Sequence, residues 1–101
     1  MSKSLTTTKR LAPVHPGELL ALEMKARGLS ALALSLKLRV PANRISEIVR
    51  ARRGITAETA LRLGRYLGTG AELWMRLQSD FDLATAERDL GKTIIREVEA
   101  A

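Results

Sequence analysis

The fold is decided by the stretch from Leu29 to Gly54, which reads LSALALSLKLRVPANRISEIVRARRG. Apolar or small residues recur in it at the i, i+3, i+4 spacing of one buried helix face. They are Leu29, Ala33, Leu34 and Leu38 in the first segment and Val40, Ile45, Ile48 and Val49 in the second. The pattern predicts two short helices joined by a tight turn, a helix-turn-helix over about residues 30–50.

Local signals mark where these two helices begin. Ser30 is placed to cap the first helix, because its hydroxyl can accept an otherwise unpaired backbone N–H. Pro41 fits the first turn of the second helix, where a missing N–H is of no consequence. Ala33 is small enough to let the two helices cross closely. In a helix-turn-helix the second helix lies in the DNA major groove, so the motif predicts double-stranded DNA as the partner.

The residues expected to read base edges lie in the N-terminal part of the second helix: Ala42, Asn43, Arg44, Ser46 and Glu47. Asn43 stands out because an asparagine amide can pair with N6 and N7 of adenine. Arg44 is either a guanine reader or a phosphate clamp. The residues expected to hold phosphates are Ser30, Lys37, Arg39, Arg50, Arg52 and Arg53. For Arg53, a carbonyl-capping or salt-bridging role is the alternative.

The charge of the chain is concentrated on this motif. The net charge is +6 over 101 residues. Residues 36–66 hold eight Lys or Arg and two acids, whereas residues 67–101 hold four and seven, which reverses the sign. A basic cluster on one segment is typical of a protein with a polyanionic partner, although a merely solvated basic surface is the alternative.

Composition argues against several other classes of protein. The length supports one domain with a modest core. There is no cysteine and only one histidine, His15, which we interpret as a residue at the start of a helix. We therefore expect no metal site and no cofactor. Because no nucleophile–base pair and no phosphate-binding glycine loop is present, we expect no enzyme.

The lengths of the apolar runs predict where in the cell the protein is located. None approaches the ~18 residues of a membrane span, so we expect no membrane partner. The N-terminal residues lack the apolar centre of a secretion signal. We expect a cytoplasmic protein associated with the bacterial nucleoid.

Outside the motif, the spacing and cap residues predict three more helices, over about residues 16–27, 56–67 and 71–90. The fold is thus predicted to be all-α, with five helices and a long C-terminal one. Gly64, in mid-helix, indicates close helix packing, since it weakens a helix by roughly 1 kcal/mol. The domain is expected over residues 15–90.

The two ends of the chain are expected to be tails. Residues 1–14 are predicted to be flexible, with Lys9 and Arg10 forming either a DNA-contacting arm or part of a disordered tail. Residues 91–101 are predicted to form a C-terminal tail, in which Ile94, Ile95 and Val98 suit a short amphipathic helix and Thr93-Ile94-Ile95 suits a strand.

The motif is part of a wider resemblance, carried by HPGE at residues 15–18, RISEIV at 44–49, RRGITAETALRLGRYLGT at 52–69 and ELWMRLQSDFDL at 72–83. In these stretches the chain resembles the HigA-type antitoxins of the Cro/phage-repressor helix-turn-helix family. The resemblance implies a homodimer that binds a palindromic operator, represses its own operon and neutralises a cognate HigB-type ribonuclease toxin, which cleaves mRNA.

The chain departs from the family pattern at three positions. Ala31 stands where the family has glutamine, so no DNA contact is expected there. Arg39 and Ala51 stand where glycine is usual. A non-glycine residue in the left-handed conformation costs about 1–2 kcal/mol, so we expect these two turns to be slightly re-shaped.

Two other functions fit the sequence. One is a stand-alone transcriptional repressor of the same fold without a toxin partner. The other is a protein-interaction module whose helix-turn-helix no longer reads DNA. The positive charge of residues 36–66 argues against the second, because a module that has lost DNA binding has no need of it.

Several apolar residues are candidates for protein–protein contact. Along the long helix runs a stripe that is expected to anchor the core or a dimer interface: Leu73, Trp74, Leu77 and Phe81. Ile94 and Ile95 are assigned to the same interface. Leu32 and Leu36 fall on the outer side of the first motif helix, and Leu22 is also off the core face. We assign Leu32 and Leu36 to an interface with the toxin or another protomer. The alternatives are that the N-terminal tail covers them or that the helix register differs.

Overall fold

The computed structural model describes residues 13–101, which form five helices and, within that range, no strand. The helices are α2 (Pro16–Arg27), α3 (Ala31–Leu38), α4 (Ala42–Val49), α5 (Ala57–Leu67) and α6 (Ala71–Glu97). The predicted all-α fold with a long C-terminal helix is confirmed. The proposed arm with Lys9 and Arg10 lies outside the described residues, as does most of the predicted flexible tail.

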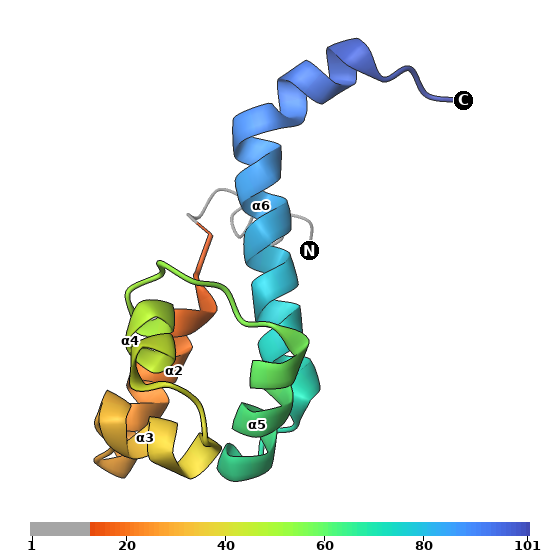
Figure 1. The fold of residues 1–101 in the computed structure, drawn as a ribbon. Helices are drawn as coiled ribbons and strands as arrows, with labels where there is room; N and C mark the ends of the chain where they lie inside the picture. Colours follow the sequence, from red (N-terminus) through yellow and green to blue (C-terminus); the bar gives the residue numbers. More distant parts are fainter. Residues whose placement is uncertain (1–12) are drawn as a thin grey trace, which may run out of the picture.

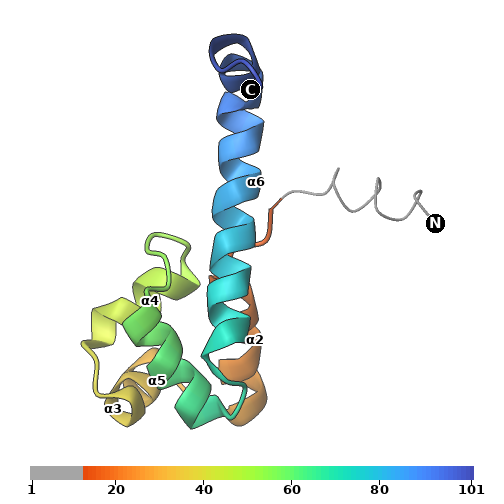
Figure 2. The same ribbon diagram turned by 90° about the vertical axis from the view of Figure 1, so that its right-hand side faces the viewer.

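Helices α2 to α5 and the first part of α6 surround one hydrophobic core (Figure 1). The second part of α6 projects beyond this body, as both views show (Figures 1 and 2). The core residues come from every helix, from the turn between α3 and α4 and from the loop before α5: Leu20, Leu34, Leu38, Val40, Ile45, Ile48, Ile55, Ala60, Leu63, Leu67 and Trp74. Among residues 13–101, no helix combines the length and the hydropathy needed to cross a membrane.

Local capping agrees with the sequence. The Ser30 hydroxyl accepts the Ala33 N–H at 3.0 Å, and the Thr56 hydroxyl accepts the Thr59 N–H at 3.3 Å. Gly28 and Gly68 end α2 and α5 in the left-handed conformation. Pro41 precedes α4 as its N-cap residue, one position earlier than expected.

The two turns of the motif keep the geometry that glycine would allow. Arg39 and Ala51 have φ angles of 59° and 60°, in the left-handed region. The expectation that these turns are re-shaped is therefore wrong, because the flanking helices fix the chain direction and the strain is borne by the backbone. Each residue is expected to cost about 1–2 kcal/mol relative to a relaxed conformation.

Two glycines allow helices to touch through their backbones. A Cβ on Gly64 would overlap the peptide between Gly70 and Ala71, which confirms the predicted close packing. A Cβ on Gly17 would overlap the carbonyl group of Ile48 in α4. No local sequence pattern marks Gly17, yet this residue sets how closely α2 approaches the second motif helix.

The end of α6 differs from the prediction. The helix continues through Gly91 to Glu97, so a boundary at residue 90 and a strand at Thr93-Ile94-Ile95 are both wrong. One glycine weakens a helix by roughly 1 kcal/mol, which is too little to end one that is long and otherwise made of ordinary helix-forming residues. The helix ends where the Val98 N–H reaches the Ile94 carbonyl at 2.8 Å.

The apolar stripe of α6 packs against the core, one of the two roles predicted for it. Trp74 is fully buried and donates its ring N–H to the Thr69 hydroxyl at 2.9 Å. Leu73 and Leu77 are half-buried against the same core, and Phe81 contacts His15. Trp74 thus belongs to the core and not to an interface, and α5 and α2 cover this face of α6. An interface role for the half-buried Leu73, Leu77 and Phe81 stays a prediction.

Candidate nucleic-acid interface

Helix α4 is held by its buried face and offers its N-terminal end to solvent. Ile45 and Ile48 are fully buried, and Val49 is half-buried. Ala42 and Asn43 are exposed at the first turn. The Ser46 hydroxyl donates to the Asn43 carbonyl at 3.2 Å, within the helix. The Asn43 side chain is thus placed on a rigid element with its amide accessible to a ligand.

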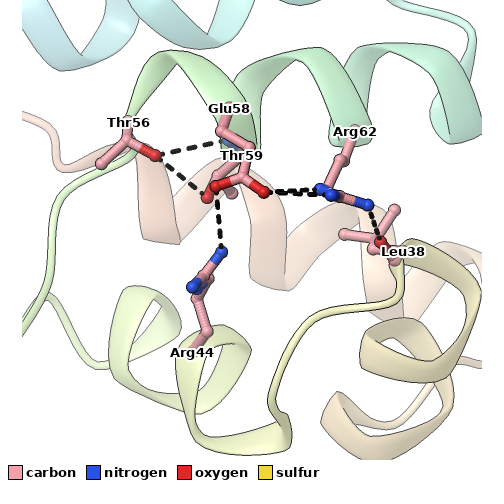
Figure 3. A network of polar contacts seen from close by, with 6 residues as sticks. All are labelled: Leu38, Arg44, Thr56, Glu58, Thr59 and Arg62. Atoms are coloured by element: carbon pink, nitrogen blue, oxygen red, sulfur yellow. Dashed lines mark hydrogen bonds and ion pairs between the residues drawn. The ribbon is translucent and has the colours of Figure 1, made fainter.

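Arg44 is tied to the neighbouring helix. Its Nη1 lies 3.8 Å from Oε1 of Glu58 in α5. The other carboxylate oxygen of Glu58 accepts from Arg62 Nε at 3.1 Å. Arg62 Nη1 in turn donates to the Leu38 carbonyl at the end of α3, at 3.0 Å (Figure 3). These contacts link α5 to the C-terminal end of the first motif helix and the N-terminal end of the second.

A second ion pair crosses the end of α4. Arg53 contacts Glu47 through Nη2 at 2.7 Å and through Nε at 2.8 Å. This is the salt-bridging alternative that the sequence left open for Arg53. Glu47 is thus paired with Arg53 and Arg44 lies beside Glu58, whereas the Asn43 side chain is exposed at the start of the helix.

The flanking cations are exposed, as a surface for a polyanion requires. Arg50, Arg52 and Arg53 are all solvent-accessible after α4. Lys37 and Arg39 line a shallow cavity of about 370 Å³ between α3 and α5. Ser30, also predicted to hold a phosphate, is exposed but its hydroxyl already caps α3.

The comparisons with known proteins identify this architecture. A helix-turn-helix family model matches residues 20–74. The chain belongs to the helix-turn-helix family. The chain is also similar to virulence-associated protein I of Dichelobacter nodosus, with 54% identity over 77 residues, which is 75% of this chain and 71% of the relative.

Two solved structures extend this helix-turn-helix assignment to the HigA group. An addiction module antidote protein of the HigA family from Coxiella burnetii is 41% identical, with a TM-score of 0.86 over 90% of this chain and 100% of that one. Antitoxin HigA of Pseudomonas aeruginosa, in a structure with the higBA promoter, is 48% identical, with a TM-score of 0.84 over 86% and 96%. The predicted resemblance to HigA-type antitoxins of the Cro/phage-repressor family is confirmed.

Three charged residues near the motif of this helix-turn-helix protein are not predicted by the sequence. Glu58 and Arg62 connect the motif to α5, and Arg65 lines the cavity with Lys37, Arg39, Arg62 and Tyr66. The available signal was the i, i+4 spacing of Glu58 and Arg62, which predicts an ion pair on one helix face. That spacing does not reveal the contacts with Arg44 and Leu38.

The remaining residues predicted for protein–protein contact are all exposed. Leu32 and Leu36 are 59% and 69% exposed, so the predicted helix register is right and these leucines are not in the core. Ile94 and Ile95 are exposed on the projecting part of α6.

His15 has the structural role expected for it. Its Nδ1 accepts the Gly17 N–H at 2.9 Å and so caps α2. Its ring meets Phe81 edge-on, with the ring centroids 4.8 Å apart. Burial lowers the pKa of His15 below its ordinary 6.5, against the opposing effects of Asp82 and Glu18. Residues 13–101 contain no group of three potential metal-ligating side chains.

Proposed function

We propose that the chain is a sequence-specific DNA-binding antitoxin. The observation that carries the proposal is the exposed N-terminal end of α4, with Asn43 accessible and exposed arginines following the helix. The structure of the related Pseudomonas antitoxin with the higBA promoter supports it. Such an antitoxin is expected in the bacterial cytoplasm, associated with the nucleoid.

Each group of residues has a distinct role in this proposal. Asn43 and Arg44 read bases, with Ala42, Ser46 and Glu47 lining the same surface. Arg50 and Arg52 hold phosphates, as do Lys37, Arg39 and Ser30. Arg53 holds a phosphate and also braces Glu47 through the ion pair of 2.7 Å.

Binding to the promoter region of the protein's own gene tests the proposed DNA-binding function. Replacing Asn43 by Ala is expected to weaken binding by about 1–3 kcal/mol at particular base positions. Arg52→Gln, the matched phosphate variant, is expected to weaken operator and scrambled duplexes alike and to reduce the salt slope by about one. If Asn43→Ala leaves the sequence preference unchanged, the base-reading assignment is wrong.

A two-fold dimer would place two recognition helices about 34–36 Å apart, to match one turn of a palindromic operator. One short motif contacts few bases, which favours a second copy. Exposed apolar side chains on the projecting part of α6 support self-association there: Leu83, Leu90, Ile94 and Ile95. Sedimentation equilibrium of the wild type and of Leu90→Glu with Ile94→Glu tests this. A micromolar monomer with a non-palindromic operator would contradict it.

The proposal that the protein neutralises a toxin rests on its similarity to the HigA relatives. Their antitoxin and antidote names support a cognate HigB-type ribonuclease as partner. Exposed Leu32 and Leu36 are the proposed protein interface, with the toxin or another protomer. Co-expression with the small basic open reading frame beside the gene tests it: rescue of growth supports the antitoxin, whereas the lack of such a neighbour favours a stand-alone repressor.

A further inference from the structure

Glu58 is the only carboxylate that an ion pair connects to the base-reading end of α4 among residues 13–101. Its position is fixed from two sides. The Thr56 hydroxyl caps the first turn of α5, which carries Glu58. Arg62, one turn later, contacts the carboxylate at 3.0 Å and is itself anchored on the Leu38 carbonyl (Figure 3). Glu58 is therefore an acceptor oriented by Arg62.

The contact between Glu58 and Arg44 is looser than the contact with Arg62. At 3.8 Å it is an ion pair, and no hydrogen bond accompanies it. The Arg44 side chain is 25% exposed and that of Glu58 is 61% exposed. Such a contact directs the Arg44 guanidinium towards α5 without locking it. Exposed ion pairs of this kind shift the equilibrium between the paired and the unpaired side chain by a factor of about two to five.

We propose that Glu58 is a positioning residue that sets the DNA specificity of the motif by restraining Arg44. The proposal rests on the DNA-binding function given above. An unrestrained arginine at this position can contact a phosphate on any sequence. With Glu58 in place, Arg44 reads a base edge while its guanidinium stays beside the carboxylate, whereas a phosphate contact requires it to leave, so non-operator DNA is disfavoured more than the operator.

The test compares an operator duplex, located by footprinting upstream of the gene, with a scrambled duplex of equal length. Glu58→Gln keeps the shape of the side chain and a carbonyl oxygen for Arg62, but removes the charge. Affinity for the scrambled duplex is expected to rise about two- to five-fold. The salt slope on that duplex should steepen by roughly 0.9, the value for one more phosphate contact. Operator affinity should change less, so the ratio of the two affinities falls.

The same substitution in an Arg44→Gln background separates this mechanism from simple repulsion. If Glu58 acts through Arg44, Glu58→Gln has no effect on the ratio in that background. An equal effect in both backgrounds means that Glu58 merely repels phosphates, and the proposal is overturned. Glu72→Gln is the matched control, since Glu72 is the first-turn acid of α6 and makes no ion pair with the motif.

The failure of this inference and the failure of the proposed function give different results. A wild-type chain without any operator preference overturns both. A wild-type chain that prefers its operator, with an unchanged ratio in Glu58→Gln, overturns the role of Glu58 alone. Circular dichroism and the unfolding midpoint of each variant show that the compared proteins are folded.

Discussion

The Ile55 backbone N–H donates to Oε1 of Gln78 at 2.7 Å, in a buried contact between residues 23 positions apart. The loop that leaves the recognition helix α4 is thereby fastened to α6. Gln78 also donates from Nε2 to Asp82 at 2.9 Å, and Gly54 packs against the Gln78 amide. A single buried side chain thus fixes the path of the chain directly after the arginines of the motif.

Replacing Gln78 by Met tests this contact. Methionine fills a similar volume but leaves the buried Ile55 N–H without an acceptor, which is expected to destabilise the fold by about 1–3 kcal/mol. Urea denaturation measures the loss, with the exposed neighbour Ser79→Ala as the control that should change little. Equal stability of the Gln78→Met variant and the wild type would show that the loop does not depend on this bond.

Gly17 is predicted to tolerate no side chain. In Gly17→Ala the new Cβ overlaps the Ile48 carbonyl, so α2 and α4 must separate, at a cost of about 1–3 kcal/mol. Gly91→Ala is the matched control, because its Cβ would find its nearest neighbour at 3.9 Å. That variant is expected to gain roughly 1 kcal/mol of helix stability. Destabilisation by Gly91→Ala would contradict the continuous helix α6.

Ala51 is predicted to be better replaced by glycine. Its left-handed conformation costs about 1–2 kcal/mol, whereas glycine adopts it freely. The larger entropy that glycine loses on folding offsets about 0.5–1 kcal/mol of this gain, so a net stabilisation remains. Gly28→Ala is the reverse experiment, since Gly28 has φ 66° and no atom within 4 Å of the added Cβ. Thermal unfolding should show opposite signs for the two variants.

His15 is predicted to make stability depend on pH. The pKa of His15 is lower in the folded protein than in the unfolded chain. As pH falls below about 6.5, His15 is therefore protonated in the unfolded chain before it is protonated in the folded protein. The free energy of unfolding should therefore be highest above that pH and decline as pH falls towards the lower folded-state pKa. His15→Asn keeps a capping side chain without this titration, so its unfolding free energy should decline less between pH 7 and 5. Parallel curves for the two proteins would rule out the effect.

Leu32 and Leu36 are predicted to serve a protein partner. Glutamate at both positions should leave the fold and operator binding nearly intact, because both side chains are exposed already. The same double variant should abolish one protein–protein contact, which size-exclusion chromatography with the toxin, and alone, detects. Leu61→Glu, at another exposed leucine, is the control. Unchanged binding in both assays would show that the two leucines form no interface.

The sequence by itself determined the elements that depend on neighbours within about one helical turn. The i, i+3, i+4 spacing placed Leu34, Leu38, Ile45 and Ile48 on buried faces, and the cap residues fixed where α3 and α5 begin. These features follow from local geometry, so reading along the chain is sufficient to find them. The same reading identified Leu32 and Leu36 as residues outside the core.

Only the tertiary structure decided which distant groups meet. It moved Trp74 from a possible interface into the core, carried α6 through Gly91, and joined Arg62 to the Leu38 carbonyl across 24 positions. The contacts of Glu58 with Arg44 and of Gln78 with Ile55 belong to the same class. Such contacts depend on the angles and distances at which whole helices pack, and these are set by the combined fit of many side chains and of glycines such as Gly17. Even at Gly64, the sequence indicated close packing but not the partner, the peptide between Gly70 and Ala71.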